Sequence, residues 1–213
     1  ESSVWNPTKC LTMLVPPGQF DIPWVWDVRS YGNQISVAYS WARRPDYLFK
    51  TTQESVALDY GYRVAEYKSG HIKIKDFGFA GKPLSPYEGD YVGGISLHPL
   101  DPEVAVISSS VDPKDGRELS DKTHAIYIVR NDDNRSFYRA IIESLHNSDI
   151  RPRYTEFSPK GFQLLYMSGK YEHCTRFFTS IKIIGFVPGI SSFSVRDRTY
   201  DLPWNLSTDS DLP

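Results

Sequence analysis

Short apolar runs separated by turn residues form the dominant pattern of the chain. Clear examples are Ile35–Ser40, Val104–Ser108 and Phe162–Tyr166, each bounded by Gly, Pro, Asn or Asp within a few residues. Runs of this length, rich in β-branched and aromatic residues, are typical of β-strands. The same pattern predicts further strands at Val25–Arg29, Tyr62–Tyr67, Ile72–Phe77, Tyr91–Leu97, Ala125–Arg130, Arg153–Phe157, Ser180–Phe186 and Phe193–Arg196.

Helical periodicity is nearly absent. Phe137–His146 is the best helical candidate, but its β-branched and aromatic content suits a strand for at least its first half. Short strands at this density predict an all-β protein built as a sandwich, a barrel or a propeller.

An internal repeat narrows this choice. Three hairpins, each ending in small or polar residues, alternate along the chain with three further hairpins. The first set is Val25–Ser40, Gly94–Ser109 and Arg153–Ser168, and the second set is Tyr62–Phe77, Ala125–Ile141 and Ser180–Arg196. Ile35, Val104 and Phe162 hold equivalent places, 69 and 58 residues apart. Four-stranded antiparallel units at this period indicate β-propeller blades, and the alternative is a β-sandwich with similar hairpins.

About three such blades use nearly the whole chain, whereas propellers close with ~4–8 blades. We therefore expect residues 24–200 to form blades of a larger propeller, completed by a missing N-terminal half or by a second chain. Residues 1–23 would lead in from a preceding blade, and residues 201–213 would form a C-terminal tail.

Composition excludes several classes of protein. The 24 Lys and Arg against 26 Asp and Glu give a net charge of −2, which argues against a nucleic-acid partner. Aromatic residues make up 14% of the chain, too many for a disordered segment. No run approaches the ~20 apolar residues of a membrane span, and the N-terminus Glu1–Trp5 has no signal-peptide pattern.

Several segments resemble the BNR-4 propeller family, in the family's order. They are Tyr62–Gly81, Tyr87–Leu119, Asp149–Pro152, Gln163–Tyr171 and Ile183–Val187. The resemblance implies the C-terminal half of a seven-bladed propeller that is similar to ulvan lyases and other enzymes acting at rhamnosyl–glucuronic acid linkages. It also implies a secreted or periplasmic protein, whose signal peptide is absent from this chain.

The chemistry of such a lyase points to a cluster on one stretch of the chain. Elimination next to a uronic acid needs a cation to neutralise the carboxylate, a base for the α-proton and an acid for the leaving oxygen. Arginine suits the first task because its planar fork pairs with a carboxylate, and tyrosine can serve the others. The candidate catalytic residues are Tyr39, Arg43, Arg44, Tyr60 and Arg63.

The resemblance itself carries a catalytic role only to Tyr39 and, less firmly, to Arg43 or Arg44. The family often has a basic residue before its Tyr-rich strand, where this chain has Tyr60 and Gly61. The alternative is that Tyr39 is a strand-end aromatic and the arginines are solvated loop residues.

Four further residues are candidates for substrate binding. Trp41 offers a stacking face for a sugar ring, and Tyr47 follows it in the sequence. Asp90 and Tyr91 precede a Gly-Gly pair and could contact sugar hydroxyls, although packing of Tyr91 between blades is the favoured interpretation.

No cofactor is required by this chemistry, and no metal ligands are assigned. The five histidines lack metal-ligand spacing, and the Asp-rich turns Asp112–Gly116 and Asn131–Asn134 lack the full pattern of a calcium loop, so a structural zinc or calcium ion is possible but unsupported. Cys10 and Cys174 could form one disulfide, which the sequence does not decide.

We therefore expect a polysaccharide lyase whose partner is a uronate-containing polysaccharide, with neither nucleic acid nor membrane involved. Two alternatives stay open. One is a glycoside hydrolase of rhamnosyl–glucuronate linkages, which would need a pair of carboxylates. The other is a propeller that binds a glycan or a protein without catalysis.

Overall fold

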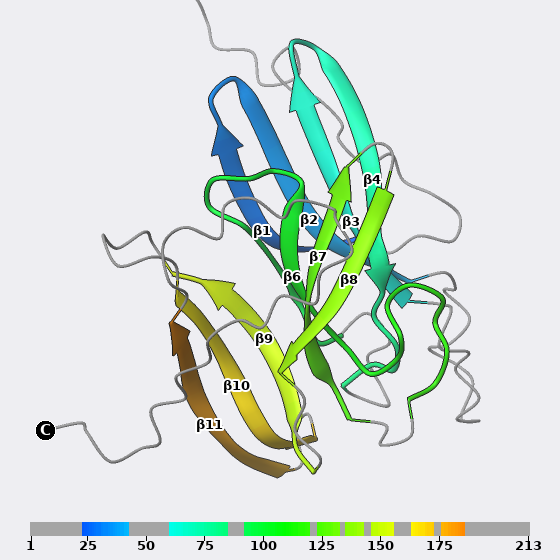
Figure 1. Cartoon of the computed structure of the whole chain (residues 1–213), viewed down its shortest axis with the longest axis vertical. Helices are drawn as coiled ribbons and strands as arrows, with labels where there is room; N and C mark the ends of the chain where they lie inside the picture. Colours follow the sequence, from blue (N-terminus) through cyan, green and yellow to red (C-terminus); the bar gives the residue numbers. More distant parts are fainter. Residues whose placement is uncertain are drawn as a thin grey trace, which may run out of the picture.

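The computed structural model describes residues 23–42, 60–84, 92–119, 123–132, 135–142, 146–155, 163–172 and 176–185. These residues form eleven strands in three antiparallel sheets, and none of them lies in a helix (Figure 1). The all-β prediction is confirmed. Consistently, nothing in the described part of the chain could cross a membrane as a helix.

Each sheet is a run of strands that are consecutive in the sequence. The first contains β1 (Trp24–Tyr31), β2 (Gln34–Ala42), β3 (Tyr60–Lys68) and β4 (His71–Phe79), in that order. The second contains β5 (Ile95–Leu97), β6 (Val104–Ser109), β7 (Ala125–Asp132) and β8 (Arg135–Ile142). The third contains β9 (Ser148–Tyr154), β10 (Gln163–Glu172) and β11 (Arg176–Gly185).

The predicted hairpins match this connectivity. β1–β2, β3–β4, β5–β6, β7–β8 and β9–β10 are all antiparallel pairs of neighbours. Of the last predicted hairpin, only the first strand falls among the described residues. Sequential four-stranded sheets fit a propeller, and the stacked arrangement also fits a sandwich, so both architectures stay compatible with the fold.

The preference for a strand in the first half of Phe137–His146 is confirmed, because β8 runs through Arg135–Ile142. One segment differs from the sequence interpretation. β9 begins at Ser148, five residues before the predicted strand, and contains Pro152. A proline is tolerated there because β9 lies at the edge of its sheet, and Arg151 has a φ of 55° where the register with β10 shifts.

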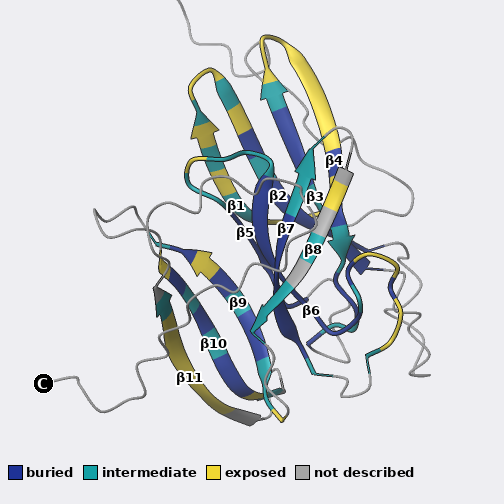
Figure 2. Cartoon of the chain, in the orientation of Figure 1, coloured by how far each residue is buried: buried dark blue, intermediate teal, exposed yellow. Residues whose placement is uncertain are grey.

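The second sheet is covered on both faces, and its strands β6 and β7 are almost entirely buried (Figure 2). On one face, Ala105, Ile107 and Tyr127 join a core cluster with residues of the first sheet, including Tyr62 and Phe77. On the other face a second cluster joins it to the third sheet. Its buried members are Val104, Val106, Ile126, Ile128, Tyr154, Leu164 and Tyr166.

Polar contacts tie together the first strands of the three sheets. Oγ of Ser96 in β5 donates to the Asp27 carboxylate in β1 at 2.8 Å and accepts from the Tyr154 backbone N–H in β9 at 3.2 Å. The Tyr31 hydroxyl donates to the His98 carbonyl at 2.6 Å. β1, β5 and β9 therefore lie next to one another, as the inner strands of neighbouring blades do.

Tyr62 links the first two sheets inside the core. Its side chain is fully buried, and its hydroxyl accepts from the Gly94 N–H at 2.7 Å and donates to the Ser108 carbonyl at 2.8 Å. Burial raises the pKa of this phenol well above its usual range, so the group stays neutral.

We expect Tyr62→Phe to lower the free energy of unfolding by about 1–3 kcal/mol, since it leaves a buried donor and a buried acceptor unpaired. Tyr67→Phe, on the partly exposed face of the same strand, is the matched control and should change it by less than about 0.5 kcal/mol. Urea unfolding monitored by circular dichroism measures both. Equal effects from the two changes would contradict the role given to Tyr62.

Candidate functional site

The structure describes four of the nine predicted site residues: Tyr39, Trp41, Tyr60 and Arg63. The other five lie outside the described residues, and their predicted roles stay predictions. They are Arg43, Arg44, Tyr47, Asp90 and Tyr91.

Tyr39, Trp41 and Arg63 lie together on one face of the first sheet. The register of β2 and β3 places Tyr39 opposite Arg63 and Trp41 opposite Gly61. The Arg63 guanidinium carbon lies 4.8 Å from the centre of the Trp41 ring, a cation–π contact. Nε of Arg63 donates to the Asp76 carboxylate of β4 at 2.7 Å. Three strands therefore hold this cation in one place.

Burial differs sharply within this group. Tyr39 is 2% exposed and Trp41 is 7% exposed, whereas 28% of the Arg63 side chain is exposed. Arg63 is therefore the member of the group that an anion in solution can reach.

Gly61 makes room for the Trp41 ring. A Cβ atom at this position would lie 2.7 Å from Cε2 and Nε1 of the indole. The absence of a side chain lets Trp41 lie flat across β3, beside Arg63. Gly61 therefore has a packing function in this sheet.

Tyr60 lies on the opposite face from Arg63. Residues three apart on a strand point to opposite sides, and Tyr60 packs in the core between the first and second sheets at 3% exposure. The structure therefore brings Tyr39, Trp41 and Arg63 together and separates Tyr60 from them.

We expect Gly61→Ala to displace the Trp41 ring and to lower the free energy of unfolding by about 1–3 kcal/mol through overpacking. Gly32→Ala in the β1–β2 turn is the control for adding a methyl group. No described atom lies within 4 Å of its Cβ position, although its φ of 62° adds backbone strain. Thermal unfolding and tryptophan fluorescence check this prediction. It is contradicted if Gly32→Ala changes the emission spectrum and Gly61→Ala does not.

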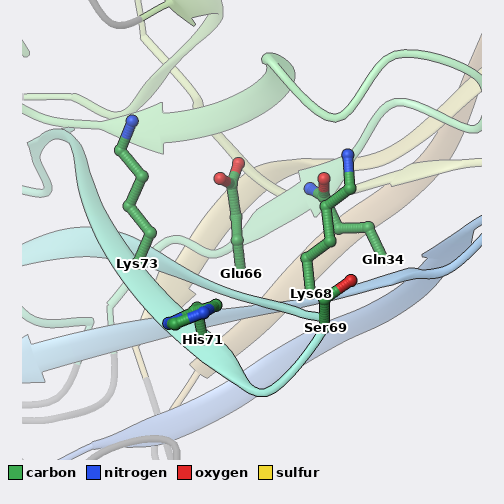
Figure 3. Close-up of a pocket in the computed structure, with 6 residues that line it drawn as sticks. All are labelled: Gln34, Glu66, Lys68, Ser69, His71 and Lys73. Carbon is green, nitrogen blue, oxygen red and sulfur yellow. The ribbon is translucent and has the colours of Figure 1, made fainter.

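A cavity of about 380 Å³ lies at the other end of the same sheet, where the β1–β2 and β3–β4 hairpins turn (Figure 3). Its lining residues are Gln34, Glu66, Lys68, Ser69, His71 and Lys73. The side chains of Lys68, Glu66 and Lys73 point the same way in Figure 3. The pocket is open to solvent, and its lining includes cations, a carboxylate and an amide, although most of the lining surface comes from the apolar parts of these side chains.

The sequence interpretation missed this cavity. Its residues come from two hairpins, and the pairing of Gln34 in β2 with Lys68 in β3 brings the hairpins together. The available signal was the polar turn Lys68-Ser69-Gly70-His71, which carries two basic side chains around a tight bend.

Glu66 also belongs to a charge group that joins the first two sheets. Nζ of Lys75 lies 3.0 Å from Glu66 and 2.6 Å from Glu103, which precedes β6. Burial lowers the pKa of Lys75, but the two carboxylates outweigh burial, so the pKa is raised overall. This lysine stays charged and binds both carboxylates.

The third sheet carries a second arginine beside an aromatic ring. The Arg151 guanidinium carbon lies 5.7 Å from the centre of the Tyr171 ring, and its Nη2 lies 3.5 Å from the Tyr171 hydroxyl. The nearby Asp149 carboxylate is fully buried, and neither of its oxygens has a hydrogen-bond partner among the described residues. This group lies where β9 begins and β10 ends.

The described histidines form no metal site, and nowhere in the described ranges do three or more His, Cys, Asp or Glu side chains cluster as ligands. Nδ1 of His98 accepts the N–H of Asp101 at 3.0 Å in the β5–β6 turn. His124 is buried, and its Nε2 lies 3.2 Å from the Lys82 carbonyl. Cys10, His173 and Cys174 lie outside the described residues.

Burial lowers the pKa of His124 to about 4, from 6.5. Between these values the unfolded chain binds a proton that the folded chain does not, so stability falls as the pH drops through this window. We expect a loss of about 3 kcal/mol from this residue between pH 6.5 and pH 4.

Unfolding of the wild type and of His124→Gln across this pH range measures the effect, and the variant should show a shallower dependence. His71→Gln, at an exposed position, is the control and should keep the wild-type dependence. If His124→Gln and the wild type lose stability in parallel, the assignment to His124 is wrong.

Comparison with known proteins adds little to this geometry. No protein-family description and no curated relative matches the chain, so the BNR-4 resemblance stays a prediction. A similar solved structure is that of a BT0996 RGII complex, with a TM-score of 0.40 and 11% identity, over 79% of this chain and 54% of that one. The chain therefore spans about half the length of that neighbour.

Proposed function

We propose that this chain belongs to a carbohydrate-active protein that binds uronate-containing polysaccharides and cleaves them as a lyase. The observation that carries the proposal is the Arg63 guanidinium, which Trp41 and Asp76 hold in place while part of the side chain stays exposed. Such a fixed guanidinium matches the planar carboxylate of a uronic acid. A polysaccharide substrate of this kind is consistent with a secreted or periplasmic protein.

In the proposed reaction, Arg63 binds the substrate carboxylate and stabilises the negative charge that develops on it. The C5–H bond and the C4–O bond break, a C4=C5 double bond forms, and the proton passes to the leaving oxygen. Tyr39 is the phenol that the register places opposite Arg63, and we assign the proton transfer to it. Tyr39 is 2% exposed, so the reaction requires the substrate to reach a nearly buried hydroxyl.

Non-catalytic glycan binding is the second candidate function. The cavity between the two hairpins favours it, since amide, carboxylate and ammonium groups are the partners that sugar hydroxyls and sugar carboxylates use. No step of the lyase reaction needs that cavity.

We expect Arg63→Gln to raise the Kd for a uronate oligosaccharide about tenfold, the value of one charged hydrogen bond of about 1.5 kcal/mol. Arg117→Gln, at a well-exposed arginine in the β6–β7 connection, is the matched control and should leave the Kd unchanged. Isothermal titration with the uronate oligosaccharide and with a neutral one of equal length measures this. Equal weakening for both ligands would count against carboxylate binding.

Turnover is tested on the same protein by the ultraviolet absorbance of the unsaturated product. Tyr39→Phe should abolish the absorbance change and keep the binding of the oligosaccharide. Binding by the wild type without any product from uronate-rich polysaccharides would favour the non-catalytic function.

A further inference from the structure

The outer face of the first sheet carries two largely apolar rows, several of whose members are exposed, while Ala65 in the middle of the first row is buried. In each row, the strand register places one residue from each of β1, β2, β3 and β4 side by side, and the two rows are neighbours on the sheet. The rows are Val28, Val37, Ala65 and Ile74, then Ser30, Ile35, Tyr67 and Ile72. Val28 is 57% exposed, Ile35 and Ile74 are 44% exposed, and Ile72 is 39% exposed.

The outer face of the third sheet is also largely apolar, although the exposed Arg153 of β9 lies beside Leu165 in one of its rows. Leu165 pairs with Ile183 and Met167 with Ile181, on the side away from the second sheet. Ile181 is 77% exposed and Ile183 is 62% exposed, and Figure 2 shows β11 as the most exposed strand of this sheet. Soluble monomers rarely leave apolar faces of this kind uncovered at both ends of a stack.

The molecule itself shows what covers such a face. The first sheet packs one face on the second sheet, and the second sheet packs its other face on the third. We call the face of a sheet that points toward the following sheet its forward face, and the opposite face its backward face. Each of these two interfaces therefore joins the forward face of one sheet to the backward face of the next. The exposed face of the first sheet is a backward face, and the exposed face of the third sheet is a forward face.

We propose that two copies of this chain pair head to tail, with the first sheet of each copy packed on the third sheet of the other. Such an interface joins two different surfaces, and two of them related by a two-fold axis close six sheets into a ring. Closure covers both apolar faces with the same type of contact that the three sheets already make. This inference does not depend on the proposed function.

The pairing also places Arg63 at a boundary between chains. The row that contains Val25, Tyr39, Arg63 and Asp76 lies next to the row of Val28 and Ile74 on the same face. A ligand at Arg63 would therefore lie beside the third sheet of the other copy.

Light scattering of the full chain during size-exclusion chromatography tests the pairing. We expect a mass of twice the 24.4 kDa of one chain. Ile74→Lys and Ile181→Lys, on the two faces, should each give the single-chain mass or raise the dimer Kd at least tenfold. Leu100→Lys changes a residue that is 67% exposed, between Ile74 and Ile181 in exposure, and lies outside both faces; it should leave the dimer intact.

A mixture of the two face variants distinguishes this arrangement from others. Each variant keeps the face that the other has lost, so mixing Ile74→Lys with Ile181→Lys should restore a dimer through one intact interface. Pairing of two first sheets would instead leave Ile181→Lys dimeric by itself. A wild-type chain that stays at 24.4 kDa at all concentrations, or an Ile181→Lys variant that dimerises normally, would overturn the proposal.

Circular dichroism and cooperative urea unfolding of each variant establish that it is folded. A variant that does not fold is replaced by Ile72→Lys on the first sheet or by Ile183→Lys on the third. These positions lie on the same two faces, so the same outcomes apply.

Discussion

The fold depends on a second sheet that is apolar on both faces. In β6 and β7, consecutive residues point to opposite sides, and both sides are buried, so this sheet must have a neighbour on each face. Burial of apolar surface stabilises by roughly 25 cal/mol per Å², which makes this the main contribution that holds three sheets together. The first and third sheets pack on the second sheet through one face each. Apart from the small buried cluster of Tyr39, Trp41 and Ala65 on the first sheet, much of their outer faces stays exposed.

Directional contacts fix how the sheets are stacked. Apolar burial alone would allow sheets to slide, but Ser96 can bind Asp27 and Tyr154 in only one arrangement of β1, β5 and β9. Tyr62 and Lys75 add contacts between the first two sheets at different positions along the strands. These contacts fix the position of the first sheet on the second, and Trp41 and Asp76 hold Arg63 on the outer face of the first sheet.

The hairpins were predictable because alternation and turn residues are local signals. β9 was predicted to start too late because Pro152 normally argues against a strand, and its place at a sheet edge is not visible in the sequence. To predict that Trp41 lies beside Arg63, one must know the register between β2 and β3. These strands are joined by 17 residues, from 43 to 59, and the alternation of apolar and polar residues does not determine their register. That Tyr60 and Arg63 lie on opposite faces, by contrast, follows from their spacing in one strand.

Native-state hydrogen exchange tests the central claim, that the doubly covered second sheet is the stable centre of the molecule. The backbone amides of β6 and β7 should exchange only through global unfolding, whereas those of β11 should exchange through local opening with a smaller free energy. Exchange in β6 and β7 that is as fast as in β11 would contradict the account.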